Sequence, residues 1–344
     1  MASAHSLGLG LGTRNARGEW LEVFYPAPLL SPSSAATAVV RQILSPTTAN
    51  QASQLDEATL AHLEEGLATA GETDLAQLAS TLRGSARPVV LTLISEDTAP
   101  KTVPEVYLKL HLLSHRLAKP HSLVLDGMFS ILPNVAWTSE GAVDPRELPA
   151  RQLAARLAGR TLNVECVDKF PKMTDYVVPA GVRIADTARV RLGAYLGEGT
   201  TIMHEGFVNF NAGTEGPNMV EGRISAGVFV DRGSDLGGGC STMGTLSGGG
   251  TVIISVGKEC LIGANAGIGI PLGDRCTVEA GLYITAGTKV RLLDDKRQPV
   301  AESAARELAG KSDLLFRRNS LSGTVECLTN QSAIALNAAL HAHN

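Results

Sequence analysis

A chain of 344 residues exceeds one small domain, and at roughly 150 residues per domain it predicts two or three structural units. Its formal net charge is -4 and it contains no basic run, so the sequence offers no positively charged surface for nucleic-acid binding. No apolar stretch approaches the ~20 residues of a membrane helix. The five scattered cysteines lack C-x-x-C spacing, so they predict neither disulfides nor a zinc site. We expect a cytoplasmic protein with no nucleic-acid partner and no membrane contact.

Residues 1–165 predict a mixed α/β domain. Runs of β-forming residues between turn residues predict strands at Trp20–Tyr25 and Pro88–Ile94. Amphipathic spacing predicts helices at Leu55–Ala70, at Asp74–Leu82 with Thr73 as its N-cap, and at Pro104–Leu117. The segment Ser31–Ser53 is heavy in Ser, Pro and Thr and predicts a loop-rich connection.

Residues 166–292 carry a ladder of aliphatic residues spaced by six. Its rungs are Ile184, Val190, Leu196, Ile202 and Val208, then Ile224, Val230 and Leu236, then Val256 and Ile262, then Leu272, Val278, Ile284 and Val290. Six residues make one short strand and one tight turn, and three such units close one coil of a prism. Neither a helical period nor strict alternation fits this spacing, so we expect a left-handed parallel β-helix.

The ladder breaks at Ala212–Met219 and within Gly237–Gly250. A solenoid extrudes insertions as loops on one face, so both breaks predict active-site loops, with plain spacers as the alternative. Residues 293–344 predict a small C-terminal extension that begins with a polar turn at Asp294–Pro299.

The reaction class follows from what such a fold offers and from the motifs that are missing. Hexapeptide prisms commonly form trimers, and the long clefts between neighbouring prisms suit an extended pantetheine arm. The sequence contains neither a P-loop motif nor a dinucleotide-binding fingerprint, which disfavours nucleotide-triphosphate chemistry and hydride transfer. Acyl transfer from a coenzyme A thioester is therefore the expected reaction.

Longer strings then resemble one family, the longer-chain tetrahydrodipicolinate N-succinyltransferases. The matching strings are Met203–Asn211, Val220–Ser225, Gly237–Gly250, Val278–Tyr283 and Phe316–Ser320. The resemblance implies a homotrimer that transfers succinyl from succinyl-CoA to the amino group of ring-opened tetrahydrodipicolinate. The product would be N-succinyl-2-amino-6-oxopimelate, in lysine and diaminopimelate biosynthesis.

The resemblance also assigns residues to roles. Glu221 matches the family's catalytic carboxylate, as base or as nucleophile, and the alternative is a solvated pair of Glu221 with Arg223. The residues that match coenzyme A contacts are Arg223, Gly238, Ser241, Ala264, Glu279, Ala280, Gly287, Arg317, Arg318, Asn319 and Ser320. Arg317 and Arg318 are phosphate partners in this interpretation, or a solvated basic pair at a strand edge in the alternative.

A metal site is implied less directly. Glu205 resembles a position that faces the trimer axis and can hold Mg²⁺, since oxygen ligands suit this ion. The second acidic position of the family here appears as Ala188, with Asp186 two residues away. A water-bridged carboxylate cluster is the alternative.

Three other functions compete. Another hexapeptide acyltransferase would use His204 as its base, and its donor pocket would lack a partner for the succinyl carboxylate. A zinc-dependent carbonic anhydrase on the same solenoid needs three histidines, whereas the ladder contains only His204. A structural scaffold would bind no coenzyme A.

Overall fold

The computed structural model describes residues 4–44, 49–244 and 252–329, and the chain divides into two compact units. The first comprises Met1–Ala118, Ser122–Pro171 and Asp175–Val177, and the second comprises Lys119–His121, Lys172–Thr174 and Val178–Asn344. In the described ranges, no helix is long and apolar enough to cross a bilayer.

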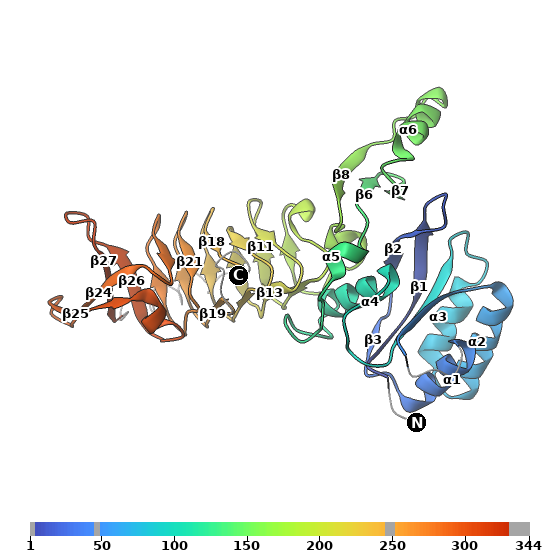
Figure 1. The fold of residues 1–344 in the computed structure, drawn as a ribbon, viewed down its shortest axis with the longest axis horizontal. Helices are drawn as coiled ribbons and strands as arrows, with labels where there is room; N and C mark the ends of the chain where they lie inside the picture. The colour runs from blue at the N-terminus through green and yellow to red at the C-terminus, as the bar shows by residue number, and fades with distance from the viewer. Residues whose placement is uncertain (1–3, 45–48, 245–251, 330–344) are drawn as a thin grey trace. The chain divides into compact units, whose positions relative to one another are not determined.

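The first unit is built on an antiparallel sheet of order β2-β1-β5-β4, with β3 paired to β1 (Figure 1). The strands are β1 Ser6–Arg14, β2 Trp20–Phe24, β3 Leu29–Leu30, β4 Gln51–Leu55 and β5 Val89–Ile94. The helices are α1 Ser34–Leu44, α2 Glu57–Thr69, α3 Thr73–Leu82, α4 Val103–Ser114, α5 Met128–Ile131 and α6 Leu148–Leu157. A smaller sheet of order β7-β6-β8 joins β6 Val135–Thr138, β7 Gly141–Val143 and β8 Val164–Asp168.

Side-chain alternation along β1 separates the two faces of the larger sheet. Leu7 and Leu9 pack into the apolar core formed with α1, α2 and α3. Gly8 faces the other way, where an added Cβ would lie 2.9 Å from Leu108 of α4 and 2.6 Å from the Tyr25 ring. Glycine therefore lets α4 and Tyr25 approach the strand closely.

The sequence located five of these elements and did not predict the others. The strand predictions and the three helices are confirmed by β2, β5, α2, α3 and α4. The loop prediction for Ser31–Ser53 is wrong, because the segment contains α1 and the start of β4. Thr73 is also not an N-cap: it is the first helical residue of α3, and Glu72 before it makes no side-chain capping bond.

The second unit is a left-handed parallel β-helix of three sheets, seen in Figure 1 as stacked short strands. The β10–β19 sheet contains β10 Ala194–Leu196, β13 Ala212–Thr214, β16 Phe229–Val230 and β19 Ser255–Val256. The β12–β23 sheet contains β12 Phe207–Val208, β15 Arg223–Ile224, β18 Ser241–Thr242, β21 Gly267–Gly269 and β23 Tyr283–Thr285. The β9–β26 sheet contains β9 Arg183–Ile184, β11 Thr200–Ile202, β14 Asn218–Val220, β17 Asp235–Leu236, β20 Leu261–Ile262, β22 Thr277–Val278 and β26 Leu314–Arg318.

Two antiparallel strand pairs follow the last coil in the described residues. Strands β24 Lys289–Leu293 and β25 Pro299–Ala304 form a hairpin, which confirms the predicted turn at Asp294–Pro299. Strand β26 pairs with β27 Val325–Thr329 in a second hairpin and continues the β9–β26 sheet beside β22.

The interior ladder has more rungs than aliphatic spacing revealed. Thr214 pairs with Leu196 and Val230, Val220 pairs with Ile202 and Leu236, and both are fully buried. The Thr214 hydroxyl lies 2.8 Å from that of Thr200, so the polar rung has an internal hydrogen bond. Ala212–Met219 is therefore regular coil, and its prediction as an extruded loop is wrong.

The first part of the second predicted break is regular coil. Thr242 and Ile268 are paired rungs of the β12–β23 sheet, so the coil continues through Gly237–Thr242. Residues 245–251 of this predicted loop lie outside the described residues.

Candidate functional site

Glu221 stands where the β9–β26 sheet turns into the β12–β23 sheet, along a line that we call the Glu221 edge. The amide of Gly239 donates to the Glu221 carbonyl at 3.3 Å, and that of Asn265 donates to the Gly238 carbonyl at 2.8 Å. The amide of Gly281 donates to the Ala264 carbonyl at 2.8 Å. These bonds stack the predicted contacts Gly238, Ala264 and Ala280 in successive coils after Glu221.

The corner at Glu221 is shorter than its neighbours. Only Glu221, Gly222 and Arg223 separate the interior rungs Val220 and Ile224, whereas five residues separate the corresponding rungs of the next coil, Leu236 and Thr242. The coil before it also places five residues between Ile202 and Val208. Fewer residues give the chain less reach around the corner, so this coil is recessed between two longer ones.

Two close contacts hold the short corner in place. A Cβ on Gly222 would lie 2.2 Å from the Cys240 sulfur, so Gly222 packs directly on that buried side chain. A Cβ on Gly238 would lie 3.2 Å from the Glu221 Oε2, so the carboxylate rests on the Gly238 backbone. Burial raises the pKa of Cys240 to about 12, so its thiol stays protonated and fills space.

The Glu221 carboxylate is half-buried and has no side-chain partner in the described part of the chain. Arg223 is exposed on β15, and within those ranges the two residues form no ion pair. The structure therefore does not contain the Glu221–Arg223 pair that was the alternative interpretation. A half-buried carboxylate without a partner is available to accept a proton.

The β12–β23 sheet presents an outward row beside this edge. Arg223 is the direct neighbour of Ser241, which neighbours Gly267, which neighbours Tyr283. The Tyr283 ring lies over Gly267, where an added Cβ would be 2.2 Å from its Cε1 atom. Sequence reasoning singled out Arg223 and Ser241 but missed the Tyr283–Gly267 contact, for which the sequence offers no local signal.

The C-terminal hairpin meets the far end of the edge through Glu279. The Arg318 amide donates to the Glu279 carboxylate at 2.6 Å. Arg317 donates to buried Glu326 at 3.0 and 2.9 Å, and the Asn319 amide group donates to the same carboxylate at 2.9 Å. The Asn319 hydrogen bond, followed by Arg317, lowers the pKa of Glu326. Glu326, which sequence reasoning missed, thus fixes the predicted segment Arg317–Ser320.

Not every predicted residue joins this group. Six predicted residues lie on the Glu221 edge or in the row beside it: Arg223, Gly238, Ser241, Ala264, Glu279 and Ala280. The segment Arg317–Ser320 meets this edge through the hydrogen bond between the Arg318 amide and Glu279. Gly287 lies past the end of β23, on the side of that strand away from the edge. Arg318 is exposed, whereas Arg317 is half-buried against Glu326.

His204 and Glu205 lie in the coil before Glu221. The His204 Nδ1 is 2.9 Å from the Glu205 carboxylate, and Arg189 donates to the same carboxylate at 2.7 Å. His204, followed by Arg189, lowers the pKa of Glu205. Asp186 instead accepts a hydrogen bond from the Ala188 amide at 3.0 Å. Within the described ranges, no three His, Cys, Asp or Glu side chains form a group that could hold a metal ion.

Stacked hexapeptide coils with small residues along a carboxylate-bearing edge define an acyltransferase of the hexapeptide-repeat class. Family models match the chain as "Tetrahydrodipicolinate N-succinyltransferase N-terminal" at residues 71–130, as the "middle" region of the same enzyme at residues 132–172, and as "Hexapeptide repeat of succinyl-transferase" at residues 253–286. The chain belongs to the tetrahydrodipicolinate N-succinyltransferase family.

Full-length relatives support this membership. Proteins named 2,3,4,5-tetrahydropyridine-2,6-dicarboxylate N-succinyltransferase from Pseudomonas putida and Vibrio cholerae are 66% and 58% identical, each over 98% of this chain and 98% or 99% of its own length. A crystal structure from Campylobacter jejuni, described as a 2,3,4,5-tetrahydropyridine-2-carboxylate N-succinyltransferase, superposes with a TM-score of 0.89 at 31% identity. That comparison covers 97% of this chain and 94% of the other.

Proposed function

We propose that the protein transfers succinyl from succinyl-CoA to the amino group of ring-opened tetrahydrodipicolinate, with Glu221 as the general base. The carrying observation is the half-buried Glu221 carboxylate, which has no side-chain partner among the residues that the structure describes and is recessed on an edge lined by small residues. Named relatives of the same length support the choice of substrates.

The proposed step needs one proton acceptor and donors for the developing oxyanion. The amine nitrogen forms a bond to the thioester carbonyl carbon, the carbon–sulfur bond breaks, and CoA leaves as the thiol. Glu221 accepts the proton that the amine must lose and returns it to the departing sulfur, so the carboxylate is regenerated. The coenzyme A arm is proposed to follow Gly238, Ala264 and Ala280, where small residues leave room along the edge, and to end at Arg318.

A single-turnover experiment tests this role for Glu221. The enzyme is mixed with succinyl-CoA, and CoA release is followed with and without the amine substrate. Release that requires the amine supports the general base. A stoichiometric burst without the amine would instead show that the Glu221 carboxylate takes the succinyl group as a nucleophile.

The assembly is proposed to be a homotrimer, because prisms of this kind offer flat outer sheets and the Glu221 edge of one chain leaves a bound arm open on one side. Light scattering is expected to give three times the 35.9 kDa chain mass. We also propose a cytoplasmic location, which is consistent with the free, buried thiols of Cys240, Cys260, Cys276 and Cys327.

The expectation of magnesium at Glu205 gains no support from the surrounding residues, which do not suit the ion. Arg189 already neutralises the Glu205 carboxylate, and Asp186 caps a turn. No step is assigned to a metal. Dialysis against EDTA is expected to leave the melting temperature unchanged, whereas a fall that Mg²⁺ alone restores would show that an ion is bound.

Replacing Glu326 by glutamine is expected to raise the KM for succinyl-CoA several-fold with little change in kcat, because Arg317 and Asn319 lose their shared anchor. The pKa of Glu326 is lowered from its usual 4.5, so its stabilising effect is full above that pH and is lost as the pH falls through the lowered value. The melting-temperature difference from wild type should therefore be largest near neutral pH and shrink in acid. An unchanged KM would contradict the role of this hairpin in donor binding.

A further inference from the structure

The first unit contains a cavity of about 470 Å³ that the proposed acyl transfer does not use. Strands β1 and β2 form one side, the smaller β7-β6-β8 sheet forms another, and Asp175 and Tyr176 complete it. The volume lies within the range of small-molecule sites.

The charged side chains that line this cavity favour a ligand with a positive net charge. Three carboxylates line it, from Glu22, Glu165 and Asp175, against one guanidinium from Arg87. Glu165 and Asp175 are exposed at the rim, whereas Glu22 is 4% exposed. A ligand with more positive than negative charge therefore fits best.

Glu22 lies deep in this cavity with two hydroxyl partners and unused capacity. Its Oε1 accepts a short hydrogen bond from Thr13, and its Oε2 accepts one from Tyr176 at 3.2 Å. Burial raises the pKa of Glu22, and Arg87 forms an ion pair with its carboxylate at 3.6 Å. A carboxylate can accept about four hydrogen bonds, so Glu22 has room for an ammonium group beside Arg87.

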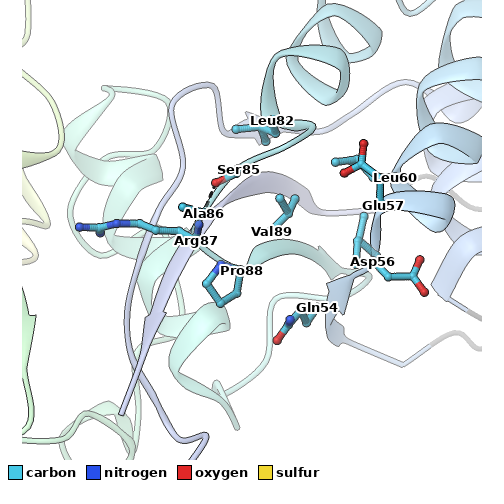
Figure 2. A pocket seen from close by; sticks show the side chains of 11 residues that line it. Gln54, Asp56, Glu57, Leu60, Leu82, Ser85, Ala86, Arg87, Pro88 and Val89 are labelled. Atoms are coloured by element: carbon cyan, nitrogen blue, oxygen red, sulfur yellow. Dashed lines mark hydrogen bonds between the residues drawn. The ribbon is translucent and has the colours of Figure 1, made fainter. Parts of the chain in front are cut away.

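The Arg87 guanidinium makes its contacts with residues of this cavity. It also lines a second cavity of about 300 Å³, but Figure 2 shows its side chain pointing away from Asp56 and Glu57 there. Its guanidinium instead donates to Thr13 at 3.2 Å. In the second cavity Asp56 caps α2 and Glu57 pairs with Arg83.

The geometry points to a binding site for a basic α-amino acid, and we propose that its α-carboxylate binds Arg87 and its α-ammonium binds Glu22. The two anchors are adjacent, as the two α-substituents of a zwitterion are. The side-chain ammonium would meet the rim carboxylates Glu165 and Asp175. Aromatic rings of Phe24, Trp137 and Tyr176 line the same cavity and suit an aliphatic stem and its cation.

Calorimetric titration of the full-length protein with L-lysine tests the site without any acyl substrate, so its outcome is independent of the proposed reaction. We expect saturable binding, weakened at least tenfold in Glu22→Gln and in Arg87→Ala. The control Glu57→Gln removes an acid of the second cavity and should bind as wild type does. L-norleucine, which lacks the side-chain ammonium, should bind at least tenfold more weakly.

Absence of saturable heat would overturn the proposal, as would equal affinity in wild type and Glu22→Gln, or equal affinity for L-norleucine. Arg87 has a half-exposed side chain, so Arg87→Ala keeps the test decisive even if Glu22→Gln fails to fold. Circular dichroism melting of each variant checks folding.

Discussion

Replacing Glu221 by glutamine is expected to lower kcat about 10²- to 10⁴-fold, the usual contribution of a positioned general base. Glutamine keeps the size of the side chain and its position over Gly238, so the binding edge should survive. The KM for succinyl-CoA should therefore change little. CoA release, followed spectroscopically with succinyl-CoA and tetrahydrodipicolinate, gives both constants.

Two variants serve as controls for this result. Glu259→Gln removes an exposed acid elsewhere on the same β-helix and should keep wild-type activity. His204→Ala should also remain active, because the ring is exposed and contacts Glu205 rather than the recessed corner. Loss of activity only in His204→Ala would show that His204 is the general base instead of Glu221. Absence of CoA release in wild type would contradict the proposed substrates.

Replacing Gly222 by alanine is expected to destabilise the β-helix by about 1–3 kcal/mol, the usual cost of overpacking, and to abolish most activity. The new methyl would lie 2.2 Å from the Cys240 sulfur and 2.8 Å from the Cys240 carbonyl oxygen. The short corner must then shift, and Glu221 shifts with it. Thermal melts and initial rates measure the two losses.

The double variant Gly222→Ala with Cys240→Ala separates these contacts. Removing the sulfur relieves the closest clash, so part of the lost stability should return, and the cycle should show a coupling energy between the two sites. Simple additivity of the two single variants would contradict direct packing of Gly222 on Cys240.

Spacing alone predicted the β-helix because most interior rungs are aliphatic and most of them follow one another after six residues. It failed at Thr214 and Thr242, since a threonine becomes an interior rung only when its hydroxyl finds a partner inside the prism. That partner comes from another coil, which one stretch of sequence does not reveal. The same limit produced a false loop at Ala212–Met219.

The candidate site divides in the same way. The family resemblance predicted Glu221, Gly238 and Ala264 as site residues. The backbone hydrogen bonds of the structure show that they lie on one edge of the β-helix. The packing of Gly222 on Cys240 and the anchoring of Arg317 by Glu326 join residues that are distant in sequence, and pairing partners of this kind follow only from the fold. Helix α1 was missed because Ser, Pro and Thr near its start resembled a loop.

The three-residue corner at Glu221 also suggests how a repeat protein can acquire a reactive position. Regular hexads give every coil an equivalent edge, and a substitution on that edge leaves the new side chain flush with its neighbours. Loss of two residues from one corner draws that position inward while the rungs on both sides keep their register. Changes of repeat length, as much as changes of residue, can therefore create pockets in a solenoid, and restoring two residues here would return the edge to a uniform wall.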